Sequence, residues 1–193
     1  ARVAGAANAV LRREDGSLVG DQFDGTGFVR GVQRKGFSLV GRRALVVGNG
    51  GVGSPIAASL AEAGVAGMGL FDPDASASDS LRGRLQDNYA QLEVVTGSAD
   101  PAGYDLVVNA SPLGMSDGDP LPVDIDRLSP GTFVGEVVMR RELTPFLQAA
   151  LDRGCPVQVG KDMLYEQIPA YLEFFGLGTA TPDELRAVSL AED

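Results

Sequence analysis

The chain has 193 residues, of which 44% are hydrophobic and 22% charged, and its net charge at pH 7 is −10. This composition is typical of a globular protein with a substantial core, and an acidic chain without a basic run is a poor ligand for nucleic acid or an anionic membrane surface. With no bilayer-length apolar stretch, no signal peptide, one cysteine and no histidine, we expect a cytoplasmic protein with no disulfide, imidazole base or metal site.

The first part of the chain predicts a β-hairpin followed by a helix. Residues 9–13 and 17–20 flank an Asp-Gly pair at 15–16, which is typical of a tight hairpin turn. Asp24 is placed to cap a helix over 26–35, and Gly36 would end that helix.

A glycine-rich turn follows the first strongly apolar strand. Residues 45–47 predict a buried strand, a G-x-G-x-x-G pattern over 48–53 comes next, and a helix is expected over 54–63. Such a junction lets the backbone approach a pyrophosphate and directs a helix N-terminus at its charge. The next strand, 68–71, is followed by Asp72, about twenty residues past the last glycine, where a carboxylate can hold a ribose 2′-hydroxyl. A tight turn without a ligand is the structural alternative.

The rest of the chain alternates between strands and helices. The predicted elements are a polar helix over 78–86, apolar strands over 92–95 and 105–108, a loop over 109–115, a strand over 133–139, a helix over 144–153, a strand over 157–159, a helix over 161–175 that Pro169 would kink or divide, and a short helix from Thr181. This alternation predicts an α/β fold with a doubly wound parallel sheet, Rossmann-like, with flanking helices.

Several sequence blocks occur in the order of one known family. The blocks are Gly5-Ala6-Ala7-Asn8, Asp24-Gly25-Thr26-Gly27-Phe28, Gly48-Asn49-Gly50-Gly51, Asn109-Ala110-Ser111-Pro112-Leu113-Gly114-Met115, Thr144-Pro145-Phe146-Leu147 and Gly160-Lys161-Asp162-Met163-Leu164-Tyr165-Glu166-Gln167. Together they resemble the shikimate dehydrogenases, including the quinate/shikimate and shikimate-dehydrogenase-like branches, from near the first residue to about residue 176.

The resemblance implies two α/β domains, an N-terminal substrate domain and a Rossmann domain, with the last helices returning to the substrate side. We accordingly expect residues 1–24 to be a remnant of the substrate domain that includes the hairpin, 25–160 to bind the dinucleotide, and 161–193 to form the returning helices. The chain is then the later portion of a longer protein. The family's catalytic lysine would lie upstream, because Lys35 and Lys161 stand in the wrong sequence context.

The resemblance also assigns roles to individual residues. Asp24 is similar to the aspartate that pairs with the catalytic lysine, and Asn8 resembles the asparagine that hydrogen-bonds the substrate hydroxyls. Gln167 is similar to the substrate-binding glutamine of the late helix. The residues expected to bind the coenzyme are Gly48, Asn49, Gly50, Gly51, Val52, Gly53, Asp72, Asn109, Ala110, Ser111, Met115 and Gly160. Alone, each polar residue has a structural alternative, such as an N-cap for Asp24, a turn for Asn8 and a solvated helix position for Gln167.

Two positions depart from the family pattern. NADP-dependent members follow the second strand with an Asn-Arg-Thr segment, whereas this chain has Asp72-Pro73-Asp74 and no base before Arg82. A carboxylate there repels a 2′-phosphate, so we expect NAD in preference to NADP. Met139 stands where the main branch has a tyrosine near the substrate carboxylate, which leaves open shikimate, quinate or another cyclic polyol acid.

The predicted function is hydride transfer between NAD(P) and a shikimate-like hydroxy acid. We expect no nucleic-acid or membrane partner, with a second copy of the chain as a candidate partner, and no activity from this chain alone. One alternative is a non-catalytic NAD-binding module or degenerate paralogue. Another is an adenylating enzyme, because Gly50 to Pro55 locally resemble an ATP loop, although the single cysteine cannot supply that family's cysteine pairs.

Overall fold

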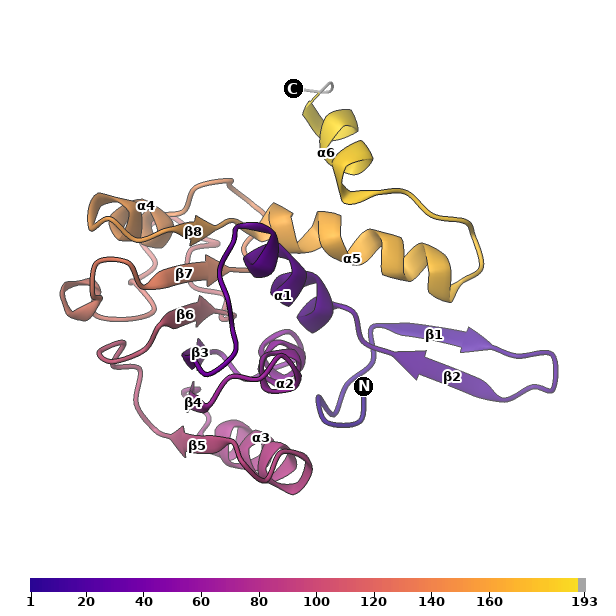
Figure 1. Cartoon of the computed structure of the whole chain (residues 1–193), viewed down its shortest axis with the longest axis horizontal. Coiled ribbons are helices and arrows are strands. Elements are labelled where there is room, and N and C mark those ends of the chain that lie inside the picture. Colours follow the sequence, from indigo (N-terminus) through magenta and orange to yellow (C-terminus); the bar gives the residue numbers. More distant parts are fainter. Residues whose placement is uncertain (191–193) are drawn as a thin grey trace.

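A six-stranded, wholly parallel sheet forms the centre of this computed structural model, which describes residues 1–190. The strands are β3 (Arg43–Val47), β4 (Gly67–Phe71), β5 (Glu93–Thr96), β6 (Leu106–Asn109), β7 (Phe133–Glu136) and β8 (Val157–Gln158). Their order across the sheet is β5-β4-β3-β6-β7-β8, so the direction of winding reverses between β3 and β6 (Figure 1). The predicted doubly wound sheet is confirmed.

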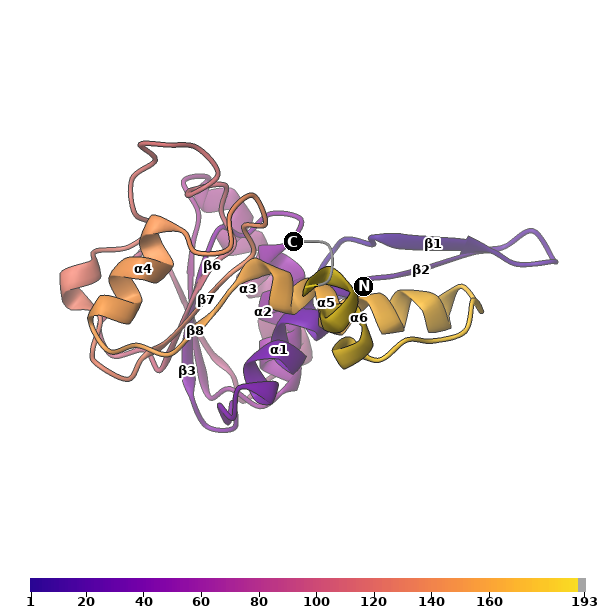
Figure 2. The same cartoon turned by 90° about the horizontal axis from the view of Figure 1, so that it is seen from above.

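Helices cover both faces of this sheet, and the last two helices of the chain extend beside it (Figure 1). They are α1 (Asp24–Arg34), α2 (Gly53–Glu62), α3 (Ala75–Asn88), the 3₁₀ turn η1 (Ile125–Arg127), α4 (Pro145–Asp152), α5 (Gly160–Phe174) and α6 (Pro182–Leu190). Seen from above, α4 lies on one side of the sheet, and α1, α2 and α3 lie on the other (Figure 2). None of the helices in the described residues combines the length and apolar character that crossing a membrane requires.

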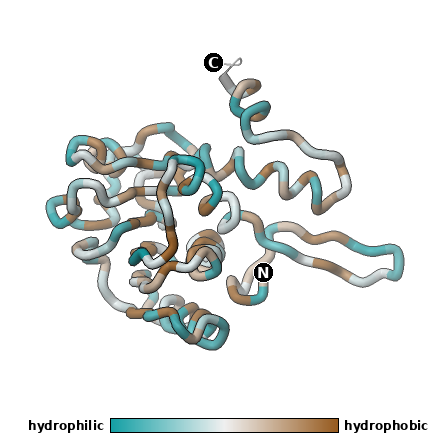
Figure 3. The backbone as a smooth tube through the Cα atoms, viewed as in Figure 1, coloured by the Kyte–Doolittle hydropathy of each residue, from teal (hydrophilic) through white to brown (hydrophobic). Residues whose placement is uncertain are grey.

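Alternate side chains of each strand enter two separate cores. Ala44 and Val46 of β3 belong to the core under α1, α2 and α3, whereas Leu45 and Val47 belong to the core under α4. The period of two expected for a strand therefore supplies both faces from one apolar run. Apolar residues gather along the central strands, and the outer turns are mostly hydrophilic (Figure 3).

A two-stranded antiparallel hairpin projects away from the sheet. It consists of β1 (Ala9–Arg12) and β2 (Leu18–Asp21), paired so that Ala9 lies opposite Asp21, close to the predicted bounds. The hairpin and α5 extend from the same side of the molecule (Figures 1 and 2). Val10 and Leu18 are 57% and 70% exposed, so the hairpin buries little apolar surface of its own.

The predicted capping role of Asp24 is wrong. Helix α1 begins at Asp24 and not at Thr26, Phe23 occupies the N-cap position, and no side chain caps this end. The reason is a tertiary contact, because Asp24 Oδ1 accepts a hydrogen bond of 2.9 Å from Asn8 Nδ2.

Other element bounds also differ from those predicted. Helix α5 is continuous through Pro169, and so the predicted division is wrong. Gly27 of α1 lies close to Met163 and Gln167 before the proline, and the N-cap Phe23 packs on Tyr171 and Phe174 after it, which supports the helix on both sides. Strand β7 ends at Glu136 and not at Met139, since the chain leaves the sheet to pass α5, where the Val138 carbonyl lies against Gly160. Helix α3 begins earlier than predicted because Asp74 caps it by accepting from the Ser76 amide, and it ends two residues later, at Asn88.

Candidate active site

A cavity of about 560 Å³ opens at the carboxyl edge of the sheet, where β3, β4 and β6 end. This is the point at which the winding reverses, the usual ligand site of open α/β sheets. The lining residues are Val47, Gly48, Gly50, Gly51, Val52, Phe71, Asp72, Pro73, Ala110, Ser111, Pro112, Leu113 and Pro122. Seven of the predicted coenzyme residues are therefore brought together here: Gly48, Gly50, Gly51, Val52, Asp72, Ala110 and Ser111.

The glycines of the turn have two different physical roles. Gly48 has a φ of +89°, and a Cβ there would lie 2.6 Å from the Ser111 amide nitrogen, so this position needs glycine to fold. A Cβ on Gly53 would collide with the Gly48 carbonyl. Gly50 and Gly51, in contrast, face open space, with no protein atom within 4 Å of a built Cβ. Their bare backbone, just before the N-terminus of α2, fits a pyrophosphate.

Asp72 holds the turn and lines the cavity at the same time. Its Oδ2 accepts a 2.7 Å hydrogen bond from the Asn49 amide, and its Oδ1 accepts one of 2.9 Å from the Asp74 amide. A carboxylate has about four lone-pair sites, which leaves acceptor capacity for a ribose hydroxyl. The side chain is placed at the end of β4, as the sequence predicts.

The two predicted asparagines point into the protein and not into the cavity. Asn49 is 3% exposed; its Nδ2 donates to the Val46 carbonyl, and its Oδ1 accepts from Ser78 Oγ. Asn109 is fully buried; its Nδ2 donates to the Leu113 carbonyl, and its Oδ1 accepts from the Ser111 amide and hydroxyl. Both side chains therefore shape the loops that line the cavity.

Three other predicted coenzyme residues do not line the cavity. Gly53 packs against the start of its own turn, as described above, and Gly160 packs against the Val138 carbonyl. Met115 is 46% exposed at the end of the loop after β6. Among the described residues, no group of three or more histidine, cysteine or acidic side chains is arranged to hold a metal ion.

The predicted substrate residues gather near the start of α1. Asn8 donates to Asp24 Oδ1, and Asn8 Oδ1 accepts from the Phe23 amide at 3.1 Å. Burial raises the pKa of the Asp24 carboxyl above its ordinary value, against the lowering effect of hydrogen bonds with Gln22 and Asn8. Asp24 is thus a partly desolvated carboxyl with a fixed neighbour, which is suited to hold a hydroxyl.

Gln167 joins this group from α5. It is 7% exposed, and a Cβ on Gly27, one turn after Asp24, would lie 2.8 Å from the Gln167 Cβ. Its buried Oε1 has no hydrogen-bond partner among the described residues. A buried polar atom in this state is unfavourable unless a ligand completes its hydrogen bonding, so this orphaned amide oxygen fits a bound polyol.

Two residues near this group were missed by the sequence reasoning. Gln22 Oε1 accepts from the Asp24 amide at 2.8 Å and its Nε2 donates to the Gly51 carbonyl at 3.5 Å, which joins the substrate group to the glycine turn. Tyr171, one turn after Gln167, packs edge-on against Phe23, and burial together with the charge of Asp24 raises its phenol pKa. The i, i+4 spacing of Gln167 and Tyr171 was the available signal.

Neither lysine is a hydrogen-bond or ion-pair partner of Asp24 in the described residues. Lys35 is at the opposite end of α1, where its Nζ lies 3.0 Å from Asp162, and Lys161 is in the first turn of α5.

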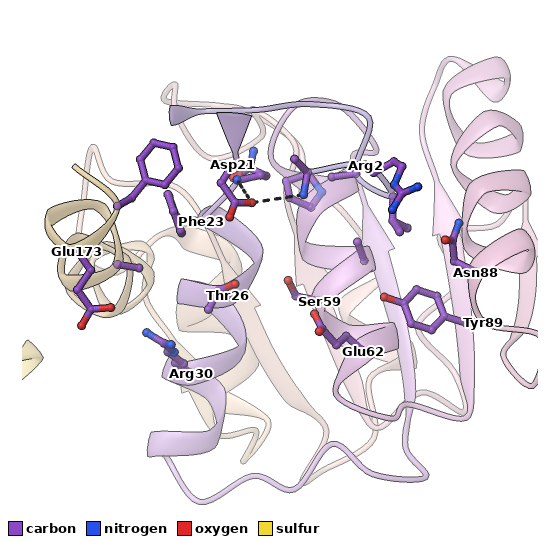
Figure 4. A pocket seen from close by; sticks show the side chains of 18 residues that line it. Arg2, Asp21, Phe23, Thr26, Arg30, Ser59, Glu62, Asn88, Tyr89 and Glu173 are labelled. Atoms are coloured by element: carbon purple, nitrogen blue, oxygen red, sulfur yellow. Dashed lines mark hydrogen bonds and ion pairs between the residues drawn. The ribbon is translucent and has the colours of Figure 1, made fainter. Parts of the chain in front are cut away.

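A second, wider hollow of about 700 Å³ lies between α1, α2, the end of α5 and the first residues of the chain. Thr26 and Arg30 of α1 and Ser59 and Glu62 of α2 line it (Figure 4). Glu62 and Glu173 bring negative charge and Arg2 and Arg30 bring positive charge, so the surface is mixed and selects no obvious ligand.

Comparisons with known proteins agree with this geometry. No protein-family model matches the chain. The shikimate dehydrogenase (NADP(+)) of Rubrobacter xylanophilus is 37% identical over 194 residues, which cover 98% of this chain and 68% of that protein. The quinate dehydrogenase of Corynebacterium glutamicum, solved with NAD, is 29% identical with a TM-score of 0.85 and covers 98% of this chain and 69% of its own.

A third relative has a different name. The 5-ketofructose reductase of a Gluconobacter strain, solved without ligand, is 30% identical with a TM-score of 0.83, over 94% of this chain and 67% of its own. All three relatives are oxidoreductases, and in each the match spans about two thirds of their length. The identity, the coverage and the shared sheet together place the chain: it belongs to the shikimate dehydrogenase family of NAD(P)-dependent oxidoreductases.

Proposed function

We propose that the chain forms the coenzyme-binding part and one wall of the polyol site of a dehydrogenase. The reaction interconverts shikimate, or a quinate-like cyclic polyol acid, with its 3-dehydro ketone. The observation that carries this proposal is the junction made by Gln22, which links the bare Gly51 backbone to the Asp24–Asn8 pair. A dinucleotide in the cavity would thus lie next to the hydroxyl-binding residues.

Each part of the site has a role that follows from its chemistry. A bound nicotinamide dinucleotide would supply the hydride acceptor for the alcohol. Gly50 and Gly51 would accept its pyrophosphate against bare backbone, and Asp24 and Asn8 would hold the hydroxyl of the reacting carbon. The orphaned Gln167 Oε1 would accept from a further hydroxyl, which orients the ring.

NAD is the coenzyme we propose in preference to NADP. The support is local: Asp72 lines the cavity, and none of the residues that line it in the described structure is a lysine or arginine. The first base after this turn, Arg82, lies 3.3 Å from Asp79 and so is already paired. A phosphate on the ribose would therefore meet a carboxylate and no cation. The Rubrobacter relative is named an NADP(+) enzyme, so this proposal gives the present chain a different coenzyme preference from that relative.

Calorimetric titration with NADH and NADPH tests this preference. We expect NADH to bind more tightly than NADPH. We expect Asp72→Asn to lower the ratio of the NADPH Kd to the NADH Kd by about tenfold, or ~1.4 kcal/mol, because this substitution removes the repelling charge and keeps a similar shape. Asp74→Asn is the matched control, since asparagine caps α3 as well as aspartate does and residue 74 does not line the cavity. Equal or tighter NADPH binding by the unmodified protein would contradict the proposal.

The identity of the substrate is tested by assaying the enzyme with several candidate compounds. Met139, 40% exposed beyond the end of β7, offers no hydroxyl to a substrate carboxylate. This favours including 5-ketofructose, a ketose without a carboxylate, beside shikimate and quinate. Oxidation of shikimate or quinate by the full-length polypeptide is the expected result. Tight dinucleotide binding without turnover of any of the three would indicate a non-catalytic module, and a preference for ATP would indicate an adenylating enzyme.

A further inference from the structure

Glu136 is a fully buried carboxyl at the carboxyl end of β7. The register of the parallel strands sets it beside Asn109, the last residue of β6. Asn109 is the residue whose side chain folds the loop after β6, and that loop lines the dinucleotide cavity through Ala110, Ser111 and Leu113. Glu136 is therefore one strand away from the cavity wall, and it does not line the cavity itself.

The carboxyl also contacts the start of α4. Its Oε2 accepts a 2.9 Å hydrogen bond from Thr144 Oγ1, and that hydroxyl in turn accepts from the Leu147 amide at 3.2 Å as the N-cap of the helix. Gly114, in the loop after β6, lies next to Thr144, because a Cβ built on Gly114 would be 3.6 Å from the Thr144 Cβ. Thr144 thus joins the helix, the buried carboxyl and the far end of the loop.

The second oxygen of Glu136, Oε1, is buried and has no hydrogen-bond partner among the described residues. A buried carboxylate with an unpaired oxygen is strongly unfavourable, whereas a neutral carboxyl in the same position is tolerated. We propose that Glu136 is a positioning residue for the coenzyme, which in its neutral form holds the loop 110–115 through Asn109 and Thr144. The inference rests on the proposed dinucleotide function of this cavity and deepens it.

The electrostatics supports this geometry. Burial raises the pKa of Glu136 to about 7, although the hydrogen bond from Thr144 and the nearby side-chain amide of Asn109 lower it. Those two neighbours are uncharged, as is the nearest β8 partner of this strand, Gln158, which donates to the Phe28 carbonyl. The charged residues of the segment that follows, Arg140, Arg141 and Glu142, do not contribute to this shift, and Arg141 is paired with Asp117.

Ionisation of Glu136 should make NADH binding weaker as pH rises. Below pH 7 the carboxyl is neutral and the loop is held; as pH rises through about 7 the carboxyl ionises, the unpaired charge disfavours this arrangement, and the loop loosens. We therefore expect the Kd for NADH to rise several-fold between pH 6 and pH 8.5. Glu136→Gln keeps the shape and stays neutral at every pH, so this variant should bind NADH with an affinity that does not change over the range.

The test is calorimetric titration of NADH into the chain and its variants across that pH range. Glu142→Gln, an exposed carboxyl in the same connection, is the matched control and should keep the unmodified profile. Thr144→Val removes the link to α4 and should weaken NADH binding, whereas Thr144→Ser, which retains the hydroxyl, should restore it; this pair gives a second readout if Glu136→Gln does not fold.

The variants test the role of Glu136, and NADH binding by the unmodified chain tests the proposed function. A Glu136→Gln variant that keeps the pH dependence of the unmodified chain overturns the positioning role, even if NADH binds. A Thr144→Ser variant that binds as poorly as Thr144→Val overturns the proposed hydroxyl contact. If neither NADH nor NADPH binds the unmodified chain at any pH, the proposed function of the cavity fails, and the inference fails with it.

Discussion

The Asp24 carboxyl is partly desolvated, so its ionisation lowers the stability of the folded protein. Burial raises its pKa, so the folded protein binds its proton more tightly than the unfolded chain does. The stability that results is complete below the unfolded pKa of about 4 and is lost as pH rises through the folded value. We therefore expect the Tm of the unmodified protein to fall relative to Asp24→Asn between pH 3 and pH 7. Scanning calorimetry measures this, with the exposed Asp87→Asn as control; an unchanged difference contradicts it.

At the scale of elements, the strand–turn–helix unit separates glycines that shape the fold from glycines that admit a ligand. Gly50→Ala adds a methyl group to open space, so we expect a Tm within about 2 °C of the original and an NADH affinity at least about tenfold weaker. Gly53→Ala collides with Gly48, so both Tm and binding should fall. Thermal unfolding and titration of both variants check this. Undiminished NADH binding by Gly50→Ala would show that the open space is not the pyrophosphate site.

At the scale of the whole molecule, this chain forms only one wall of the proposed polyol site. Asn8 precedes β1, a strand of the hairpin with exposed apolar residues, and bonds to Asp24 at the start of α1, whereas Lys35 Nζ is paired with Asp162. We therefore expect the 193-residue chain by itself to bind dinucleotide without oxidising shikimate or quinate, since among the described residues no lysine pairs with Asp24, which is proposed to hold the reacting hydroxyl. Absorbance of NADH at steady state measures this, with the Rubrobacter enzyme as positive control. Turnover by the chain alone would contradict it.

Patterns local in sequence predicted the architecture well. The glycine turn, the apolar strands and the terminal Asp72 define the first crossover without any distant information, and the structure places them as expected. The continuous α5 and the short β7 were not predictable in this way. Pro169 breaks an isolated helix, but α5 packs along α1, and β7 stops where α5 passes, both of which involve segments far away in the chain.

The doubly wound sheet, the place of the cavity and the family could all be predicted from the sequence, because periodicity and ordered motifs are properties of short segments. Which polar side chains face the cavity depends on contacts between distant segments. Asn49 and Asn109 turn inward to Ser78 and Leu113, Asp24 pairs with Asn8 and not with its own helix, and Glu136 is buried beside Asn109. The physical reason is that a polar side chain points to the partner that satisfies it, and that partner comes from wherever the fold brings another segment close.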